Sequence, residues 1–109
     1  MEQLWWVHQL SNQIIKHVFG EYFDQTNGLG TVTSGVKWQI GEDIEGLGAF
    51  RNMSNPPAYG DPDKMSSLNY FLGSDDNGGV HYNSGINNKA AYLMVDGDNF
   101  NGKTISSLG

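Results

Sequence analysis

Apolar side chains in the first part of the chain recur at the spacing of an α-helix. They return every three or four residues, which places them along one side of a helix. Gly20 interrupts the pattern at a cost of about 1 kcal/mol relative to alanine, and Asn27-Gly28 is a typical helix stop. We therefore predict a first helix over about Leu4–Gln25. Its apolar stripe is Val7, Leu10, Ile14, Val18 and Tyr22, broadened by Ile15, Phe19 and Phe23.

A second helix is predicted over about Asn83–Val95. Asn83 or Ser84 can cap its start by accepting a hydrogen bond from a free backbone N–H. Just upstream, Gly78-Gly79 permits positive φ or a close backbone approach. This pattern places the preceding histidine, His81, just outside the helix. The apolar face of the helix is predicted to be Ile86, Ala90, Leu93 and Met94.

The rest of the chain is predicted to be loops. Residues 29–54 are broken by glycines, and 55–74 carry proline turn signals. Short extended pieces are possible at 31–33 and 36–40. A turn is expected over 96–102, followed by the start of another element. Long loops in a compact domain usually bind something. The fold class is therefore mainly α with long irregular loops, and we expect the two helices to pack through their apolar stripes.

Composition excludes several classes of function. The 109 residues carry a net charge of −6 with six basic side chains, which argues against nucleic-acid binding. The absence of cysteine excludes disulfides and thiolate metal sites. Apolar runs are too short to span a bilayer, and the first residues lack the basic start of a signal peptide. Localisation is left open.

Two motif matches fail on their context. Residues 97–104 fit the phosphate-loop pattern G-x-x-x-x-G-K-[ST], but a predicted helix precedes them where the mechanism needs a strand. Asp96 and Asp98 suggest a calcium loop, yet Phe100 stands where the EF-hand needs an oxygen ligand. Neither nucleotide binding nor an EF-hand is expected.

The candidate chemistry lies on the glycine-rich loop before the second helix. Asp76 and His81 are five positions apart, so the carboxylate can orient the imidazole through a hydrogen bond. Such a pair suits hydrogen-bond donation to a developing oxyanion. The alternative from spacing alone is an ordinary surface histidine, which is the commoner case.

Several blocks in the same order resemble one family, the thermolysin-like neutral zinc peptidases. The blocks are GEYFD (20–24), WQIGED (38–43), RNMSNP (51–56), YGDPD (59–63) and DNGGVHYNSGINNKAAYL (76–93). The resemblance runs from about Asn12 to the C-terminus. It implies a two-lobed, zincin-like fold with zinc between the lobes. Residues 1–109 would form a single partial domain, the first part of the helical C-terminal lobe.

The resemblance implies a zinc site that this sequence does not complete. The family pattern needs H-E-x-x-H plus a glutamate from a second helix. The sequence lacks that motif, and Gln13 stands at the glutamate position. His17 replaces an aspartate that orients a zinc histidine. No zinc is therefore expected in the isolated chain, although the full-length family uses zinc and calcium.

A family calcium cluster falls near Asp24, Glu42 and Asp43. Lys37 and Gln39 replace acidic positions there. The resemblance makes the three carboxylates calcium candidates, and the alternative, which the replacements favour, is an ordinary solvated acidic surface.

The other side of the cleft keeps its residues. By resemblance, His81 stabilises the oxyanion, Asp76 orients His81, Arg51 contacts a substrate carbonyl and Phe50 lines the specificity pocket. For Arg51 the alternative is a surface ion pair.

The sequence therefore supports two functions. The first is the substrate-side half of a zinc metalloendopeptidase acting on peptides or proteins, inactive as this isolated chain. The second is a non-catalytic structural or protein-binding module derived from the same lobe. A lobe cut from a larger domain also predicts self-association through uncovered apolar side chains. The candidates are Leu4, Trp5, Trp6 and Phe71.

Overall fold

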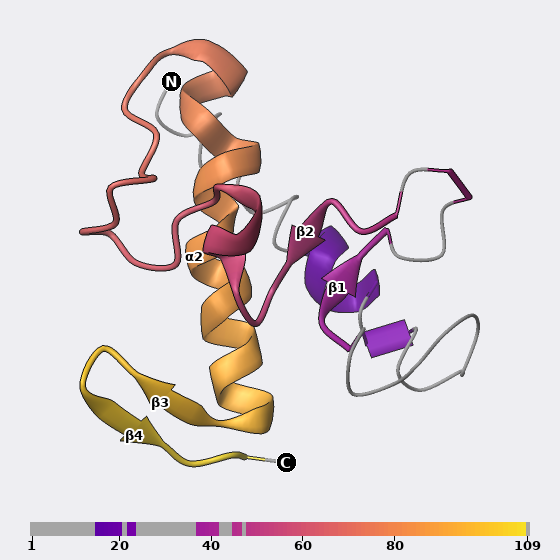
Figure 1. The fold of residues 1–109 in the computed structure, drawn as a ribbon, viewed down its shortest axis with the longest axis vertical. Coiled ribbons are helices and arrows are strands. Elements are labelled where there is room, and N and C mark those ends of the chain that lie inside the picture. Colours follow the sequence, from indigo (N-terminus) through magenta and orange to yellow (C-terminus); the bar gives the residue numbers. More distant parts are fainter. Residues whose placement is uncertain (1–14, 21, 24–36, 42–44, 47, 109) are drawn as a thin grey trace.

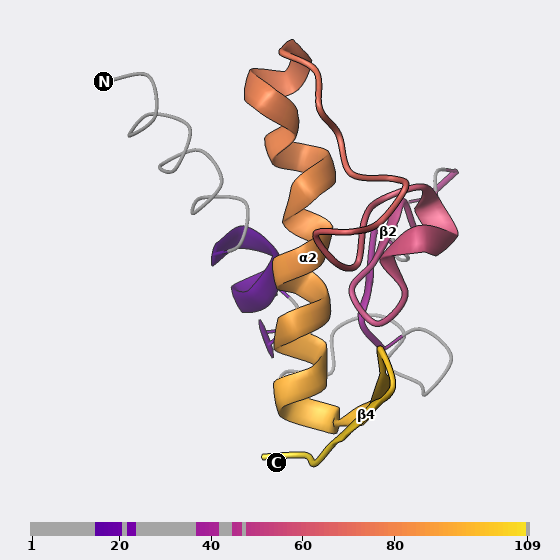
Figure 2. The ribbon, with the colours of Figure 1, turned by 90° about the vertical axis from the view of Figure 1, so that its left-hand side faces the viewer.

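One long helix organises the molecule. The computed structural model describes residues 15–20, 22–23, 37–41, 45–46 and 48–108. Helix α2 (Asp75–Asp96) runs through the middle, and residues 15–20 and 22–23 form a helical segment beside it (Figures 1 and 2). The 3₁₀ helix η1 (Pro56–Tyr59) lies in the loops that precede α2. The prediction of a mainly α fold with long irregular loops is confirmed.

The described strands form two short antiparallel pairs. Strand β1 (Gln39–Ile40) pairs with β2 (Arg51–Asn52), and β3 (Asp98–Phe100) pairs with β4 (Lys103–Ile105). The expected extended piece at 36–40 therefore contains β1, whereas 31–33 lies outside the described residues. The expected turn over 96–102 is wrong in extent. Only Asn101-Gly102 forms the turn, because the residues on either side pair as β3 and β4. The φ angles of 49° and 76° at these two residues suit the twist of a two-residue hairpin.

Helix α2 begins with a left-handed turn. Asp76, Asn77, Gly78 and Gly79 have φ between 53° and 84°, and the helix is right-handed from Val80 onward. The predicted positive φ at Gly78-Gly79 is confirmed. The predicted cap at Asn83 or Ser84 is wrong, because both lie buried inside α2 and the helix begins earlier. His81 accordingly sits within the first right-handed turn rather than outside the helix.

The buried side of α2 is mostly small and polar, which corrects the predicted apolar face. Leu93 is buried and Ile86 is half-buried, but Ala90 is exposed and Met94 is 53% exposed. The reason is that the preceding loops cover another side of the helix through polar contacts. The buried residues of that side include Val80, Asn83, Ser84, Gly85, Asn88, Lys89 and Ala91.

Two side chains tie the loops to this polar side. The Asn83 amide accepts a hydrogen bond from the Phe71 N–H at 2.9 Å and donates to the Phe71 carbonyl at 3.1 Å. The Lys89 ammonium donates to the Ser54 carbonyl at 2.7 Å and lies over the rings of Tyr92 and Phe100. Burial disfavours the charged form of Lys89 and lowers its pKa. The hydrogen bond and the ring contacts offset the free-energy cost of burying the charge.

A small apolar core lies between α2 and the β1–β2 pair. Trp38, Met53 and Ala91 are buried there. The Trp38 indole packs edge-on against Tyr92, with ring centroids 5.7 Å apart, and donates to the Asp96 carboxylate at 2.6 Å. This core brings the segment before β1 to the far end of α2.

The first helical segment meets this core through fewer residues than its stripe predicts. Val18 is half-buried against the core. The other described stripe residues are more than half exposed, namely Ile15, Phe19, Tyr22 and Phe23. The prediction that the two helices pack through their apolar stripes is therefore wrong for the described residues, because α2 presents a polar side. Val7, Leu10 and Ile14 lie outside the described residues.

No helix in the described ranges is long and apolar enough to cross a membrane. Of the residues expected to drive self-association, Phe71 is half-buried and packs against the ring of Tyr82. The others, Leu4, Trp5 and Trp6, lie outside the described residues.

Candidate active site

Asp76 holds His81 by two contacts. One carboxylate oxygen of Asp76 accepts a hydrogen bond from the His81 backbone N–H at 2.8 Å, and the other pairs with His81 Nδ1. The left-handed turn makes this possible because it folds Asp76 back over the first right-handed turn. Asp and Asn tolerate such backbone better than most residues, since their short side chains bond locally. Asp76 is therefore both a helix cap and the partner of the imidazole.

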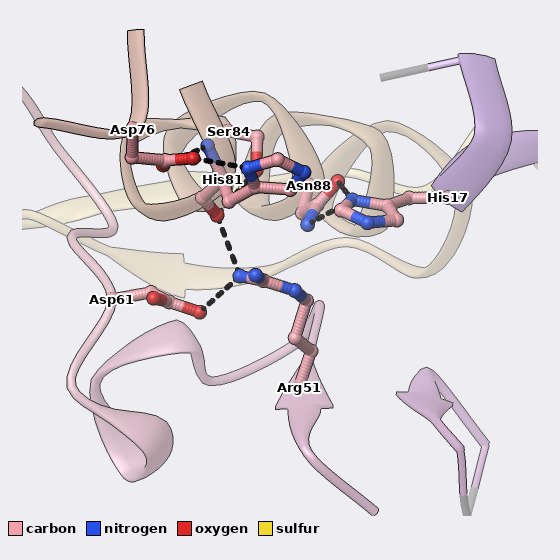
Figure 3. A network of polar contacts seen from close by, with 7 residues as sticks. All are labelled: His17, Arg51, Asp61, Asp76, His81, Ser84 and Asn88. Carbon is pink, nitrogen blue, oxygen red and sulfur yellow. Dashed lines mark hydrogen bonds and ion pairs between the residues drawn. The ribbon is translucent and has the colours of Figure 1, made fainter. Parts of the chain in front are cut away.

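The pairing leaves the other ring nitrogen of His81 pointing away from Asp76 (Figure 3). The His81 side chain is 46% exposed, whereas the Asp76 carboxyl is 20% exposed. With Nδ1 bonded to a carboxylate, the protonated ring presents Nε2–H to solvent. A protonated His81 can therefore donate a hydrogen bond to an anion while Asp76 balances its charge.

Arg51 joins the same site from strand β2. Its Nη1 donates to the His81 carbonyl at 2.6 Å and to the Asp61 carboxylate at 3.0 Å. Asp61 is only 5% exposed, and burial raises the pKa of its carboxyl while the Arg51 charge opposes the rise. Figure 3 shows Arg51 between Asp61 and the start of α2. Residues 30 positions apart are thus brought together.

His17 reaches the same side of α2 from the first helical segment. Its Nδ1 lies 3.2 Å from Oδ1 and 3.0 Å from Nδ2 of Asn88. Burial lowers the pKa of His17, the Asn88 contact raises it, and the charges of Arg51 and His81 lower it. His17 therefore lies next to the charged cluster (Figure 3).

Phe50 stands apart from this network. It is 43% exposed, its N–H donates to the Ile40 carbonyl at 3.0 Å, and its ring packs where a side chain on Gly41 would lie. Gly41 has a φ of 90°, which favours glycine for a second reason.

The remaining predicted site residues lie outside the described residues. They are Gln13, Asp24, Glu42 and Asp43. Across the part of the chain that the structure describes, no three His, Cys, Asp or Glu side chains gather closely enough to hold a metal ion.

Two residues of the network were missed from the sequence. Asp61 belongs to a predicted proline turn, and nothing in the local pattern signals its ion pair with Arg51. Asn88 does have a signal, because positions 81, 84 and 88 fall on one side of a helix. The apolar residues of the same helix favour a different face, so the spacing of these polar positions does not decide which face is buried.

Comparison with known proteins identifies a family. Residues 12–109 match the thermolysin metallopeptidase, alpha-helical domain. A zinc metalloproteinase from Renibacterium salmoninarum is 39% identical over 104 residues, covering 90% of this chain and 19% of the relative. A bacillolysin from Bacillus cereus is 44% identical over 105 residues, covering 90% and 17%. A thermolysin from Alicyclobacillus acidocaldarius subsp. acidocaldarius is 50% identical over 105 residues, also covering 90% and 17%.

The chain thus spans less than a quarter of the length of these relatives. The resemblance identified from the sequence blocks is confirmed, including its start near Asn12. The one long helix with its loops agrees with a part of the helical C-terminal lobe. By its match to nearly the whole sequence, the chain belongs to the thermolysin metallopeptidase family.

Proposed function

We propose that this chain is the substrate-side half of a zinc metalloendopeptidase site, acting on peptides or proteins. His81 stabilises the oxyanion of the tetrahedral intermediate, and Asp76 holds and charge-balances its ring. Arg51 binds a substrate carbonyl, and Phe50 lines the specificity pocket. The observation that carries this proposal is the joining of the Asp76–His81 pair to Arg51 through the His81 carbonyl.

These residues can supply one part of the chemistry of hydrolysis. When a nucleophile attacks a peptide carbonyl, negative charge develops on the carbonyl oxygen. A donor held in place at that oxygen is typically worth a factor of about 10²–10³ in rate. In the protonated ring His81 Nε2 is such a donor, and Asp76 fixes the ring before substrate arrives. Arg51 adds a second positive charge close by.

The residues of this chain do not fit the zinc ion that the family implies. Zinc peptidases hold the metal through two histidines of H-E-x-x-H and a glutamate. This sequence has three histidines in other spacings and Gln13 at the glutamate position. A zinc-binding segment would have to come from outside these 109 residues. For calcium, Asp24, Glu42 and Asp43 stay candidates, with a solvated acidic surface as the favoured alternative.

A tetrahedral anion that mimics the intermediate tests the substrate side directly. The probe is a short peptide carrying a phosphinic group in place of the scissile amide, titrated into the ¹⁵N-labelled chain and followed by NMR. We expect shifts at His81 and Arg51. His81→Ala and Arg51→Ala should each weaken binding tenfold or more, which is about 1.4 kcal/mol. Lys103→Ala removes one positive charge on strand β4 and should leave affinity unchanged.

The second candidate is a non-catalytic structural or protein-binding module. The missing H-E-x-x-H and the glutamine at position 13 favour it for the isolated chain. The same titration separates the two candidates. Peptide binding that persists in both His81→Ala and Arg51→Ala would support the module and contradict the proposed oxyanion role.

The isolated chain is expected neither to retain stoichiometric zinc nor to cleave protein, because the metal and the general base are both needed. Metal analysis after dialysis and a fluorescent peptide assay with added zinc check this. Gln13→Glu alone should not restore activity, since the zinc histidines are still missing. Tightly bound zinc with chelator-sensitive turnover that disappears in His81→Ala would contradict this expectation.

A further inference from the structure

The loop that carries Asp61 packs closely against α2. Its N–H donates to the Pro56 carbonyl at 3.2 Å, directly after the left-handed Gly60 that ends η1. Gly85 gives the loop room to approach the helix. A Cβ built on Gly85 would lie 2.5 Å from the Pro62 carbonyl oxygen and 3.1 Å from Asp61 Cβ. The Cβ atom of Asp61 therefore lies close against α2, the helix that carries His81.

The Asp61 carboxylate faces Arg51 in a buried setting. Nη1 of Arg51 lies 3.0 Å from Oδ2 of Asp61. The Asp61 side chain is 8% exposed and the Arg51 side chain is 15% exposed. Among the described residues, Arg51 is the side-chain partner that the hydrogen bonds assign to Asp61. A carboxylate that is buried with one cation holds that cation strongly, because separating them leaves an unpaired charge.

The two hydrogen bonds of Arg51 engage only one nitrogen of its guanidinium group. Nη1 donates to both Asp61 and the His81 carbonyl. A guanidinium carries five N–H groups in a planar fork, so fixing Nη1 at two points fixes the direction of the whole plane. Both of these hydrogen bonds use Nη1, and neither uses Nη2 or Nε. Within the described residues, the N–H groups of Nη2 and Nε are therefore the ones that a ligand can bind.

We infer that Asp61 is the positioning residue for Arg51. It aims the guanidinium so that the N–H groups not used by Asp61 and His81 can bind a substrate carbonyl beside the His81 ring. This inference rests on the proposed function, which assigns Arg51 to the substrate. Asp61 itself does not touch substrate in this arrangement, since its carboxylate is buried behind Arg51.

NMR of the arginine side chains tests the positioning step without any ligand. With ¹⁵N-labelled arginine, the restrained rotation of Arg51 about Nε–Cζ gives separate Nη signals. We expect these signals to merge in Asp61→Asn, which keeps the size of the side chain but removes its charge, and in Asp61→Ser. The control is Asp63→Asn, the same charge change on the same loop, which should leave the signals separate. Dispersed amide spectra establish that each variant is folded.

The phosphinic peptide titration then tests the consequence. Asp61→Asn should lose tenfold or more in affinity, as Arg51→Ala does, and the double variant should lose no more than Arg51→Ala alone. A peptide that does not bind the wild-type chain would overturn the proposed function, while the Arg51 signals would still decide the positioning. Separate Nη signals in folded Asp61→Asn and Asp61→Ser would overturn the inference, whatever the peptide does.

Discussion

Asp76 shows how one side chain can determine both a local conformation and a site. Its left-handed backbone is unfavourable for a residue with a side chain, by roughly 1–2 kcal/mol. The hydrogen bond to the His81 N–H and the contact with His81 Nδ1 offset this cost. The same two contacts fix the start of the right-handed helix and the orientation of the imidazole.

Removing the Asp76 carboxylate should therefore destabilise the fold. For Asp76→Ala we expect the free energy of unfolding to fall by about 1 kcal/mol, the usual cost of losing a helix cap. Urea denaturation measures it. Asp75→Ala, at the exposed neighbouring carboxylate, is the matched control and should change stability much less. Equal stabilities of wild type and Asp76→Ala would contradict the cap.

We expect His17 to make the stability of the fold sensitive to acid. Its pKa is lowered below the ordinary value of 6.5, chiefly by burial. A group with a lowered folded-state pKa contributes stability that is present above its unfolded pKa and is lost as pH falls through the folded one. Protonation would also place a charge beside Arg51.

We therefore expect the free energy of unfolding to decrease as the pH falls from above 6.5 through the lowered pKa of His17. In His17→Gln, which keeps a polar partner for Asn88 but cannot be protonated, this part of the decrease should disappear. Urea denaturation at a series of pH values provides the comparison. The assignment fails if both proteins lose stability equally over that range.

At the scale of elements, α2 is built to receive loops rather than another apolar helix. Asn83, Gly85 and Lys89 lie on its buried side and each contacts a different part of the preceding loops. Polar contacts of this kind depend on position, so they hold the loops in one register on the helix. The Arg51–Asp61 pair and His81 meet because of that register.

Gly85→Ala tests the closest of these contacts. Alanine favours helix by about 1 kcal/mol over glycine, but the new Cβ would collide with the Pro62 carbonyl oxygen. Because backbone must move, we expect a net loss of about 1–3 kcal/mol in the free energy of unfolding.

The matched control is Gly20→Ala on the first helical segment, where no described atom lies within 4 Å of the new Cβ. That variant should be neutral or stabilising. A Gly85→Ala protein as stable as Gly20→Ala would show that the loop does not rest on α2 as described.

At the scale of the whole molecule, several large apolar side chains among the described residues face solvent. Leu68, Leu72 and Leu108 are each more than 80% exposed, and Met65 and Phe19 are more than 60% exposed. Apolar side chains that gather into a large exposed patch are typical of surfaces that bind another protein.

We predict that the chain associates with itself through such side chains. Light scattering over a series of concentrations should show a mass that rises above 12.0 kDa. Leu68→Asp together with Leu72→Asp should shift the mass toward the monomer, because charges oppose burial. A monomer at the highest concentration would contradict self-association.

What the amino-acid sequence determined by itself was local or shared with relatives. Glycine pairs predicted positive φ at Gly78-Gly79, apolar spacing predicted a mainly helical fold, and ordered blocks identified the family. The blocks also singled out Asp76, His81 and Arg51 as site residues, and these roles stay predictions. Asn101-Gly102 is a hairpin signal in the sequence, and the structure forms the β3–β4 hairpin there instead of the longer turn predicted over 96–102.

Only the tertiary structure decided which side of α2 is buried and which residues meet there. The apolar spacing of Ile86, Ala90 and Met94 pointed to the wrong side, because loops distant in sequence bury the polar side instead. The contact of His17 with Asn88 spans 71 positions and that of Arg51 with the His81 carbonyl spans 30. Such pairings depend on where the chain folds back, and periodicity carries no information about that, since it reports only the neighbours of a residue along its own helix.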